Sequence, residues 1–234
     1  RGAQVVVADI DEVAARRVAE AIGGKTFQVD VCDADRMQAL VDETVAELGR
    51  IDYYFNNAGI AVCGHVEDTP LESWHRVSEI NIRGVVNGVH SVYPQMIRQG
   101  SGHIVNTASI AGLLPCPGLV AYSMTKHAVV GLTKGLRVEA ARHGVKISAL
   151  CPGFVKTNIM ERADVHNWNR EDAEKDIPWN SVDTCVREAL DGVERNRELI
   201  VVTRHGRHLA RLQRMAPKLV SAVATWQLMR RNRG

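Results

Sequence analysis

Tyr122 and Lys126 stand four residues apart, and together they could transfer a proton. If the segment is helical, residues four apart share one face, one turn from each other. A free phenol has a pKa of about 10, too high for a base at neutral pH, and a nearby ammonium favours the phenolate. A tyrosine tuned in this way can exchange a proton with an alcohol or a carbonyl. Ser109 could hydrogen-bond the same substrate oxygen from a neighbouring strand end.

An ordinary pair on a surface helix has the same spacing as Tyr122 and Lys126. The strands and helices around them are therefore needed to judge whether they form a site. Short apolar runs alternate with amphipathic helical patterns along the chain. This alternation predicts an α/β fold, a doubly wound, Rossmann-like parallel sheet in one three-layer α/β/α domain. The expected strands are 4–8, 25–29, 51–55, 103–107, 145–150 and 198–202. The expected helices are 11–22, 33–48, about 70–99, 121–142 and 182–193.

Polar or turn-forming residues stand at or just after the ends of five expected strands. They are Asp9, Asp30, Asn57, Ser109 and Pro152. The carboxyl ends of parallel strands meet at one edge of a sheet, and ligands of doubly wound folds bind there. We therefore expect the ligand site at this edge.

Five motifs occur in an order that is more specific than any one of them. They are NNAG at 56–59, INIRG around Asn81, NTASIAG ending at Gly112, YSMTK at 122–126 and CPGFVKT at 151–157. Together with VVVADID at 5–11 these motifs cover nearly the whole chain. In their types and order they resemble the motifs of the short-chain dehydrogenase/reductase family. The resemblance implies an oxidoreductase that passes a hydride between a nicotinamide cofactor and a secondary alcohol or ketone.

The resemblance also implies a role for each matching residue. Tyr122 would be the general acid/base, and Lys126 would lower its pKa and hold the nicotinamide ribose. Ser109 would position the substrate oxygen, and Asn81 would hold a water that links Lys126 to a proton relay. The implied cofactor contacts are Asp9, Asp30, Val31, Asn57, Ala58, Gly59, Tyr122, Lys126, Pro152, Gly153, Val155 and Thr157.

Asp9 bears on the choice of cofactor. A carboxylate at this strand end can accept hydrogen bonds from the adenosine ribose hydroxyls and would repel a 2′-phosphate. We therefore expect NAD rather than NADP. The alternative is that Asp9 serves as the cap of the helix that begins near residue 11.

The sequence departs from the family at its beginning. The family opens with a strand and a glycine-rich turn that binds the cofactor pyrophosphate, and residues 1–11 resemble its second strand instead. We expect roughly 30 residues to be missing, either from the sequence as given or in a shortened homologue. A non-catalytic or truncated family member that acts through protein contacts is therefore the alternative function.

The residues around Ser109 and after Pro152 bear on the substrate. An apolar substrate is favoured by Leu113, Leu114, Pro115 and Leu119. The loop 158–179 is expected to close over it, as the resemblance implies. The resemblance further implies a homodimer or homotetramer through the long helices that carry Asn81 and Tyr122.

Charge divides the chain unevenly. Residues 199–234 hold eight Lys or Arg and no Asp or Glu, whereas the preceding residues carry a net charge of −6. We expect a domain at 1–203 and a basic amphipathic tail at 204–234. This tail could be a solvated face, an oligomer contact, a cover for the substrate cleft, or a surface for anionic lipid.

Cysteine and histidine usage indicates compartment and metal content. Five scattered cysteines without a CxxC fit a reducing, cytoplasmic compartment better than a disulfide scaffold. His205 and His208 lack a third ligand nearby in sequence, so we expect no metal site. We also expect no nucleic-acid partner, because dispersed tryptophans are better explained by packing than by base stacking.

Overall fold

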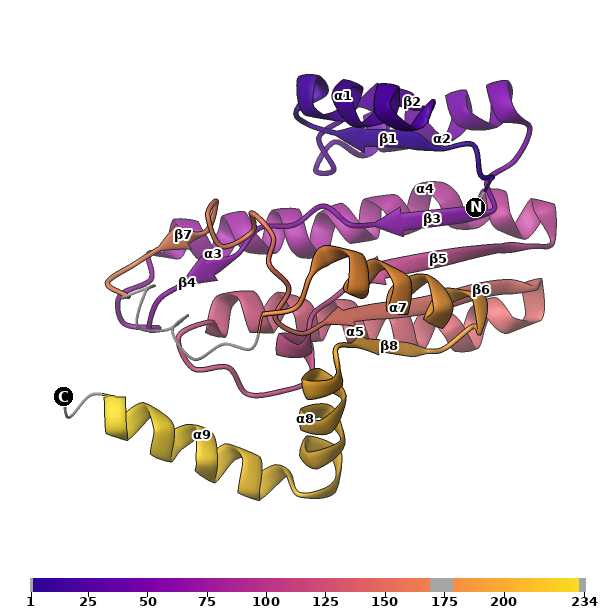
Figure 1. The fold of residues 1–234 in the computed structure, drawn as a ribbon. Helices are drawn as coiled ribbons and strands as arrows, with labels where there is room; N and C mark the ends of the chain where they lie inside the picture. Colours follow the sequence, from indigo (N-terminus) through magenta and orange to yellow (C-terminus); the bar gives the residue numbers. More distant parts are fainter. Residues whose placement is uncertain (1, 169–178, 232–234) are drawn as a thin grey trace.

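The computed structural model describes residues 2–168 and 179–231 (Figure 1). The strands are β1 (Val6–Asp9), β2 (Lys25–Gln28), β3 (Tyr53–Asn56), β4 (Val62–Cys63), β5 (Gly102–Thr107), β6 (Val145–Pro152), β7 (Asp164–Val165) and β8 (Leu199–Val202). The α-helices are α1 (Glu12–Ile22), α2 (Ala34–Leu48), α3 (Leu71–Ser78), α4 (Gly84–Gln99), α5 (Val120–Ala140), α7 (Val182–Glu194), α8 (Arg204–Met215) and α9 (Pro217–Arg231). Shorter turns are η1 (Glu79–Arg83), η2 (Ile110–Gly112) and η3 (Ala141–His143).

The predicted α/β fold with parallel strands and flanking helices is confirmed. Strands β3, β5, β6 and β8 form one parallel sheet in that order. Helices α4 and α5 cover one of its faces and α7 covers the other (Figure 1). Successive residues of β5 alternate between the two layers: Ile104 packs with α4 and α5, and Val105 packs with α7. This burial on both faces explains why the consecutive residues Ile104 and Val105 are both apolar.

The sheet is not continuous, and this differs from the sequence prediction. Strands β1 and β2 form a separate parallel pair, and no hydrogen bonds between β1 and β3 occur among the described residues. The pair is held beside the larger sheet by a small core in which Tyr54 of β3 packs with Met37 and Leu40 of α2. One edge of β1 and one edge of β3 therefore have no described partner strand. The predicted glycine-rich segment stays a prediction.

The helix from 70 to 99 is interrupted by a π-helical turn. The N–H of Gly84 donates to the carbonyl of Glu79, five residues back, where an α-helix would join residues four apart. Turn η1 therefore contains one extra residue between α3 and α4. Asn81 lies in this turn and is fully buried.

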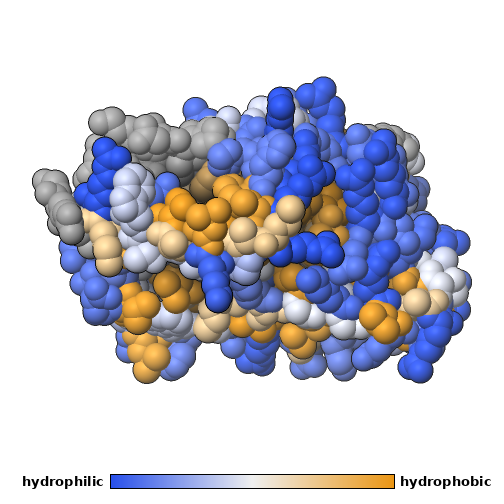
Figure 2. Space-filling view, turned by 90° about the horizontal axis from the view of Figure 1, so that it is seen from below, coloured by the Kyte–Doolittle hydropathy of each residue, from blue (hydrophilic) through white to orange (hydrophobic). Residues whose placement is uncertain are grey.

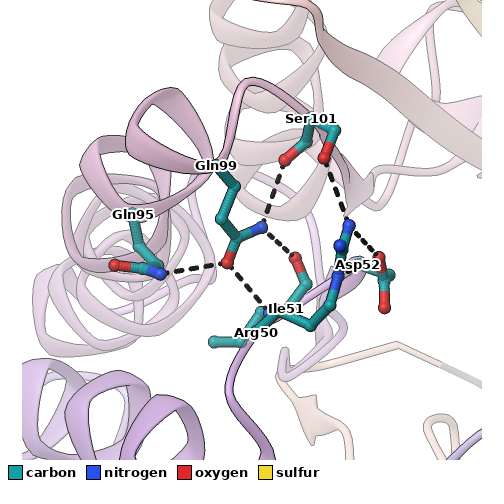
Figure 3. Close-up of polar contacts among 6 residues, drawn as sticks. All are labelled: Arg50, Ile51, Asp52, Gln95, Gln99 and Ser101. Carbon is teal, nitrogen blue, oxygen red and sulfur yellow. Dashed lines mark hydrogen bonds and ion pairs between the residues drawn. The ribbon is translucent and has the colours of Figure 1, made fainter.

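The amino ends of β3 and β5 are fixed by a side-chain amide at the end of α4 (Figure 3). The amide nitrogen of Gln99 donates to the carbonyls of Ile51 (2.9 Å) and Ser101 (3.2 Å). Its oxygen accepts from the backbone N–H of Ile51 at 3.1 Å. Arg50 adds hydrogen bonds to Asp52 and Ser101. This network lies at the end of the strands opposite to the predicted site.

The C-terminal residues form two helices. Thr203 caps α8, and Arg207 pairs with Glu188 of α7 at 2.7 Å. Helix α8 ends before Ala216, because the residue before a proline avoids helical backbone. Helix α9 then runs back beneath the domain (Figure 1). None of the described helices is both long enough and apolar enough to cross a membrane.

Candidate active site

The structure brings Ser109, Tyr122 and Lys126 together at the carboxyl edge of the larger sheet. Tyr122 lies in the first turn of α5, and its hydroxyl is hydrogen-bonded to that of Ser109. Ser109 follows β5 and also accepts from the N–H of Ala111 at 3.1 Å. Lys126 lies one turn further along α5, with its nitrogen 5.6 Å from the centre of the Tyr122 ring. The predicted juxtaposition is therefore present, and the roles of the three residues stay predictions.

Burial dominates the ionisation of this group. It raises the pKa of Tyr122 to about 12, although the hydrogen bond from Ser109 acts in the opposite direction. The sequence suggests that Lys126 lowers this pKa, and in this structure burial outweighs any such effect. Burial also lowers the pKa of Lys126 to about 8. At neutral pH Tyr122 is thus a proton donor beside a cation that is easily neutralised.

Lys126 is held by a backbone carbonyl and by no carboxylate among the described residues. Its ammonium donates to the carbonyl of Thr107 at 2.8 Å. An ammonium has three N–H groups, so two remain for a ligand. A side chain at position 59 would lie 3.4 Å from this nitrogen and 3.0 Å from Oδ1 of Asn81, so Gly59 keeps the space open. This donor set fits the hydroxyls of a nicotinamide ribose.

The low pKa of Lys126 has a consequence for stability. Between pH 8 and 10.5 the unfolded chain holds the lysine proton more often than the folded chain, so the contribution of Lys126 to stability should rise with pH in this window. We expect the change in the free energy of unfolding over this window to be more favourable in the native chain than in Lys126→Met by about 1–3 kcal/mol. Urea unfolding at about pH 7.5 and about pH 9.5 measures it. Equal pH dependence in both proteins would contradict the assignment. Burial also raises the pKa values of Cys32, Cys116 and Cys151, so their contribution to stability falls in the same window. This fall is common to both proteins and cancels in the comparison, and the similar effect of Tyr122 begins only above pH 10.

Asn81 ties the π-helical turn to the loop after β3. Its Oδ1 accepts from the N–H of Ile60 at 2.9 Å, and its Nδ2 donates to the carbonyl of Ile60 at 2.9 Å. A further hydrogen bond reaches Thr125 at 3.1 Å. Oδ1 of Asn81 would lie 3.0 Å from a Cβ at position 59. The water-holding role implied for Asn81 stays a prediction, and the structure supports a positioning role.

A buried polar chain beneath the site is not predictable from the motifs. Asn56 donates to Asn106 at 2.8 Å, and Asn106 donates to Thr133 at 3.0 Å. These residues lie on β3, β5 and α5, so the chain fixes the strand ends relative to the helix of Tyr122. A Cβ at Gly88 would lie 1.9 Å from the Asn56 oxygen, so α4 approaches this chain only through a glycine. The polar residue within an apolar strand, Asn106, is the signal that could have found it.

The predicted adenosine contacts lie at the ends of β1 and β2. Asp9 is exposed, and one of its oxygens accepts from the N–H of Asp11 at 3.0 Å. The helix cap is Asp11, so the alternative role for Asp9 is wrong. Asp30 is exposed and accepts from the N–H of Cys32. The carbonyl of Val31 accepts from Asn87 of α4, which fixes this loop against the domain.

The remaining predicted cofactor contacts follow β3 and β6. Asn57 and Ala58 are exposed, and Asn57 accepts a hydrogen bond from Thr107 at 3.2 Å. Pro152 ends β6, and a Cβ at Gly153 would lie 2.5 Å from the hydroxyl of Thr203. Further along, Val155 forms a bridge with Asn180. Thr157 is exposed, and its hydroxyl accepts from Ile159 at 3.5 Å. All of them lie at the carboxyl edge, although their contacts with a cofactor are untested.

The apolar residues expected to line the substrate site are only partly available. Leu114 is buried and Leu113 packs against the main core, so neither is free to face a substrate. Cys63, Cys116 and Cys151 are instead close enough to Tyr122 to influence its ionisation. Sequence reasoning missed these thiols because their positions relative to Tyr122 depend on the tertiary fold.

A polar clasp lies within the predicted substrate loop 158–179, of which residues 169–178 lie outside the described residues. Ser73 of α3 donates to Asp164 at 2.6 Å and contacts Nε2 of His166 at 2.9 Å. His166 and Asp164 are 3.0 Å apart, and the hydrogen bonds from Ser73 and His166 lower the pKa of Asp164. The clasp secures β7 beside β4, and beyond it Trp168 lies against Gly118, four residues before Tyr122.

A parallel sheet that gathers Ser109, Tyr122 and Lys126 at its carboxyl edge fits a dinucleotide-dependent oxidoreductase, the class that the sequence resemblance implies. The sequence model of the short chain dehydrogenase family matches residues 1–168, and the chain belongs to this family.

Known relatives agree with this class. A cyclohexanol dehydrogenase of Acinetobacter sp. (strain SE19) is 37% identical over 166 residues, which are 68% of this chain and 66% of that protein. A short-chain dehydrogenase/reductase from Burkholderia phymatum, solved in complex with NAD, is 28% identical with a TM-score of 0.80, covering 92% of this chain and 85% of that one.

A third relative binds the other dinucleotide. A gluconate 5-dehydrogenase from Burkholderia cenocepacia J2315, solved with NADP and tartrate, is 27% identical with a TM-score of 0.74, covering 86% of this chain and 84% of that one. The protein is therefore a nicotinamide-dependent oxidoreductase acting on CH–OH groups, and a non-catalytic role is not favoured.

Proposed function

We propose that the protein oxidises a largely apolar secondary alcohol, or reduces the corresponding ketone, with NAD as its cofactor. The observation that carries the proposal is the buried Lys126, which has two N–H groups free for a ligand beside the hydrogen-bonded pair Ser109 and Tyr122. The cofactor, when bound, accepts or supplies the hydride.

The chain's own residues would move the proton. Tyr122 is protonated at neutral pH and would donate to the oxygen of a ketone, while Ser109 holds that oxygen in place. In the direction of oxidation Tyr122 would accept the alcohol proton, and a charged Lys126 would favour the phenolate. Lys126 would also hold the ribose, and Asn81 would position Lys126 through the loop at Gly59.

The experiment is a screen of cyclic and open-chain secondary alcohols with NAD, followed by NADH absorbance. We expect turnover on apolar alcohols, because Cys63 and Cys116 lie near Tyr122 and Trp168 lies against Gly118, four residues before it. Turnover restricted to charged or sugar-like alcohols would contradict the apolar class and leave the oxidoreductase class intact.

The clasp at Asp164 predicts an effect on substrate binding. Asp164→Asn keeps the shape and removes the charge that Ser73 and His166 stabilise, so the loop after β7 should loosen. We expect KM to rise about 3- to 10-fold with a smaller change in kcat, because ion-supported hydrogen bonds contribute about 1–3 kcal/mol.

Steady-state kinetics measures this effect, and Gln99→Ala is the control because its network lies at the opposite end of the strands. A fall in kcat with KM unchanged would show that the clasp does not act on substrate binding. The depressed pKa of Asp164 means that its stabilising contribution is lost as pH falls toward that pKa.

Two further properties belong to the same proposal. A cytoplasmic location is supported by the five cysteines, none of which forms a disulfide bond: Cys32, Cys63, Cys116, Cys151 and Cys185. Pairing of subunits through α4 and α5 is supported by exposed apolar side chains on these helices, among them Val86 and Val138. Light scattering coupled to size exclusion would measure the subunit number, and a monomer would contradict the pairing.

A further inference from the structure

An exposed apolar stripe runs along the two C-terminal helices. It consists of Leu212 and Met215 of α8 and Leu219, Val223, Trp226 and Met229 of α9. Met215 is 84% exposed, and Trp226 and Met229 are each 59% exposed. Their spacing of three or four residues along α9 places the side chains on one side of that helix. We name these six residues the C-terminal stripe.

Helix α9 has a second apolar side, which is less exposed than the stripe. Val220, Ala224 and Leu228 are spaced by four and are half-buried. A surface helix that packs on a domain needs one apolar side, and the opposite side is ordinarily polar. The C-terminal stripe is therefore additional to what the packing of α9 requires, and exposed patches of this kind mark contact surfaces.

The stripe is bordered by cations. Exposed basic residues on the same two helices are Arg204, Arg211, Arg214, Lys218 and Arg230. The guanidinium of Arg230 lies 5.4 Å from the ring of Trp226. Residues 199–234 contain no Asp or Glu to neutralise them, and Arg207 already pairs with Glu188. Figure 2, which views the molecule from the side of α8 and α9, shows a hydrophobic patch bordered by hydrophilic residues.

The charge pattern distinguishes between two partners for the stripe, a second copy of this chain and a lipid surface. In a twofold-symmetric dimer the same patch meets its own copy, so the cations on α8 and α9 of both copies would come together without an acidic partner. An anionic lipid surface satisfies both features, because its headgroups attract Lys and Arg and its interface accepts Trp, Leu and Met side chains. We propose that α8 and α9 bind the surface of a membrane that contains anionic phospholipid.

The position of α8 would bring the candidate site near that surface. Its first residues lie against the end of β6, where a Cβ at Gly206 would be 3.8 Å from Cα of Gly153. Lipid binding by α8 and α9 would therefore place the carboxyl edge of the sheet close to the membrane. The proposal does not depend on the activity, since it is tested by binding alone.

The test is co-sedimentation of the 234-residue protein with vesicles of phosphatidylcholine alone or with about 30% phosphatidylserine. We expect binding only to the anionic vesicles, and its loss as salt is raised from about 0.05 M to about 0.5 M. Arg211→Gln with Arg214→Gln should weaken binding about 30-fold, and Trp226→Ala should weaken it at least tenfold. The controls are Arg17→Gln with Arg98→Gln and Val13→Ser, which lie elsewhere on the surface and should bind as the native chain does.

Three results would overturn the proposal. One is no binding to anionic vesicles at low salt by a protein whose circular dichroism shows it folded. Another is equal weakening by the control substitutions. The third is concentration-dependent self-association that Trp226→Ala abolishes while vesicles leave the protein in solution, which would make a second copy of the chain the occupant.

Discussion

Replacing Tyr122 by Phe is expected to reduce kcat about 10²- to 10⁴-fold, the range that general acid–base catalysis contributes. The substitution removes one oxygen and keeps the ring that packs beside Lys126. The lost atom is hydrogen-bonded to Ser109, so the structural cost is a single hydrogen bond of about 1 kcal/mol. We expect the folded chain and its nucleotide affinity to be retained.

The measurement is the rate of NADH formation or consumption with the best alcohol or ketone found in the screen. Tyr93→Phe is the matched control, because it removes the same atom from α4, where Tyr93 packs near His143. Retained turnover in Tyr122→Phe would show that another group moves the proton. Loss of turnover together with unfolding in urea at a much lower concentration would indicate a structural role instead.

Replacing Asp9 by Ser is expected to shift the ratio of NADH to NADPH affinity about 100-fold toward NADPH. Asp9 is exposed at the end of β1, and one of its oxygens is held by the N–H of Asp11. The carboxylate is therefore oriented and able to accept from ribose hydroxyls, and its charge repels a 2′-phosphate. Serine keeps a hydrogen-bonding group and removes the repulsion.

Fluorescence titration with NADH and NADPH gives the two dissociation constants directly. Asp35→Ser, which removes a carboxylate from the first turn of α2, is the control for the change in net charge. Wild-type protein that binds NADPH as tightly as NADH would contradict the role of Asp9. If neither nucleotide binds, the residues described here are insufficient for the cofactor.

The order of strands and helices could be predicted because each element carries its own periodicity. In helix α1 both ends are determined by neighbouring residues, because Asp11 caps its start and Gly23 ends it in the left-handed conformation. The meeting of Ser109 with Tyr122 also follows from local rules, because a strand end and the first turn of the next helix share one edge of the sheet.

Other features depend on distant residues and could not be predicted in this way. The clasp joins Ser73 to Asp164 across 91 positions. The pKa values of Tyr122 and Lys126 are set by burial, which is a property of the completed fold. Strands β1 and β3 lie in separate sheets. This could not be predicted, because the apolar pattern of a strand does not determine which strands it pairs with.

The π-helical turn at Glu79–Arg83 makes the length of the chain critical at this point. Each residue added to or removed from a helix rotates everything beyond it by about 100°. The extra residue in η1 allows α3 to bury Val77 and α4 to bury Val85 and Val92 while Asn81 still faces Ile60. A single-residue deletion here would give a more regular helix whose two halves could not both keep their contacts. The turn therefore works as a phase adjustment between two helical faces, and insertions or deletions should be tolerated far less here than substitutions.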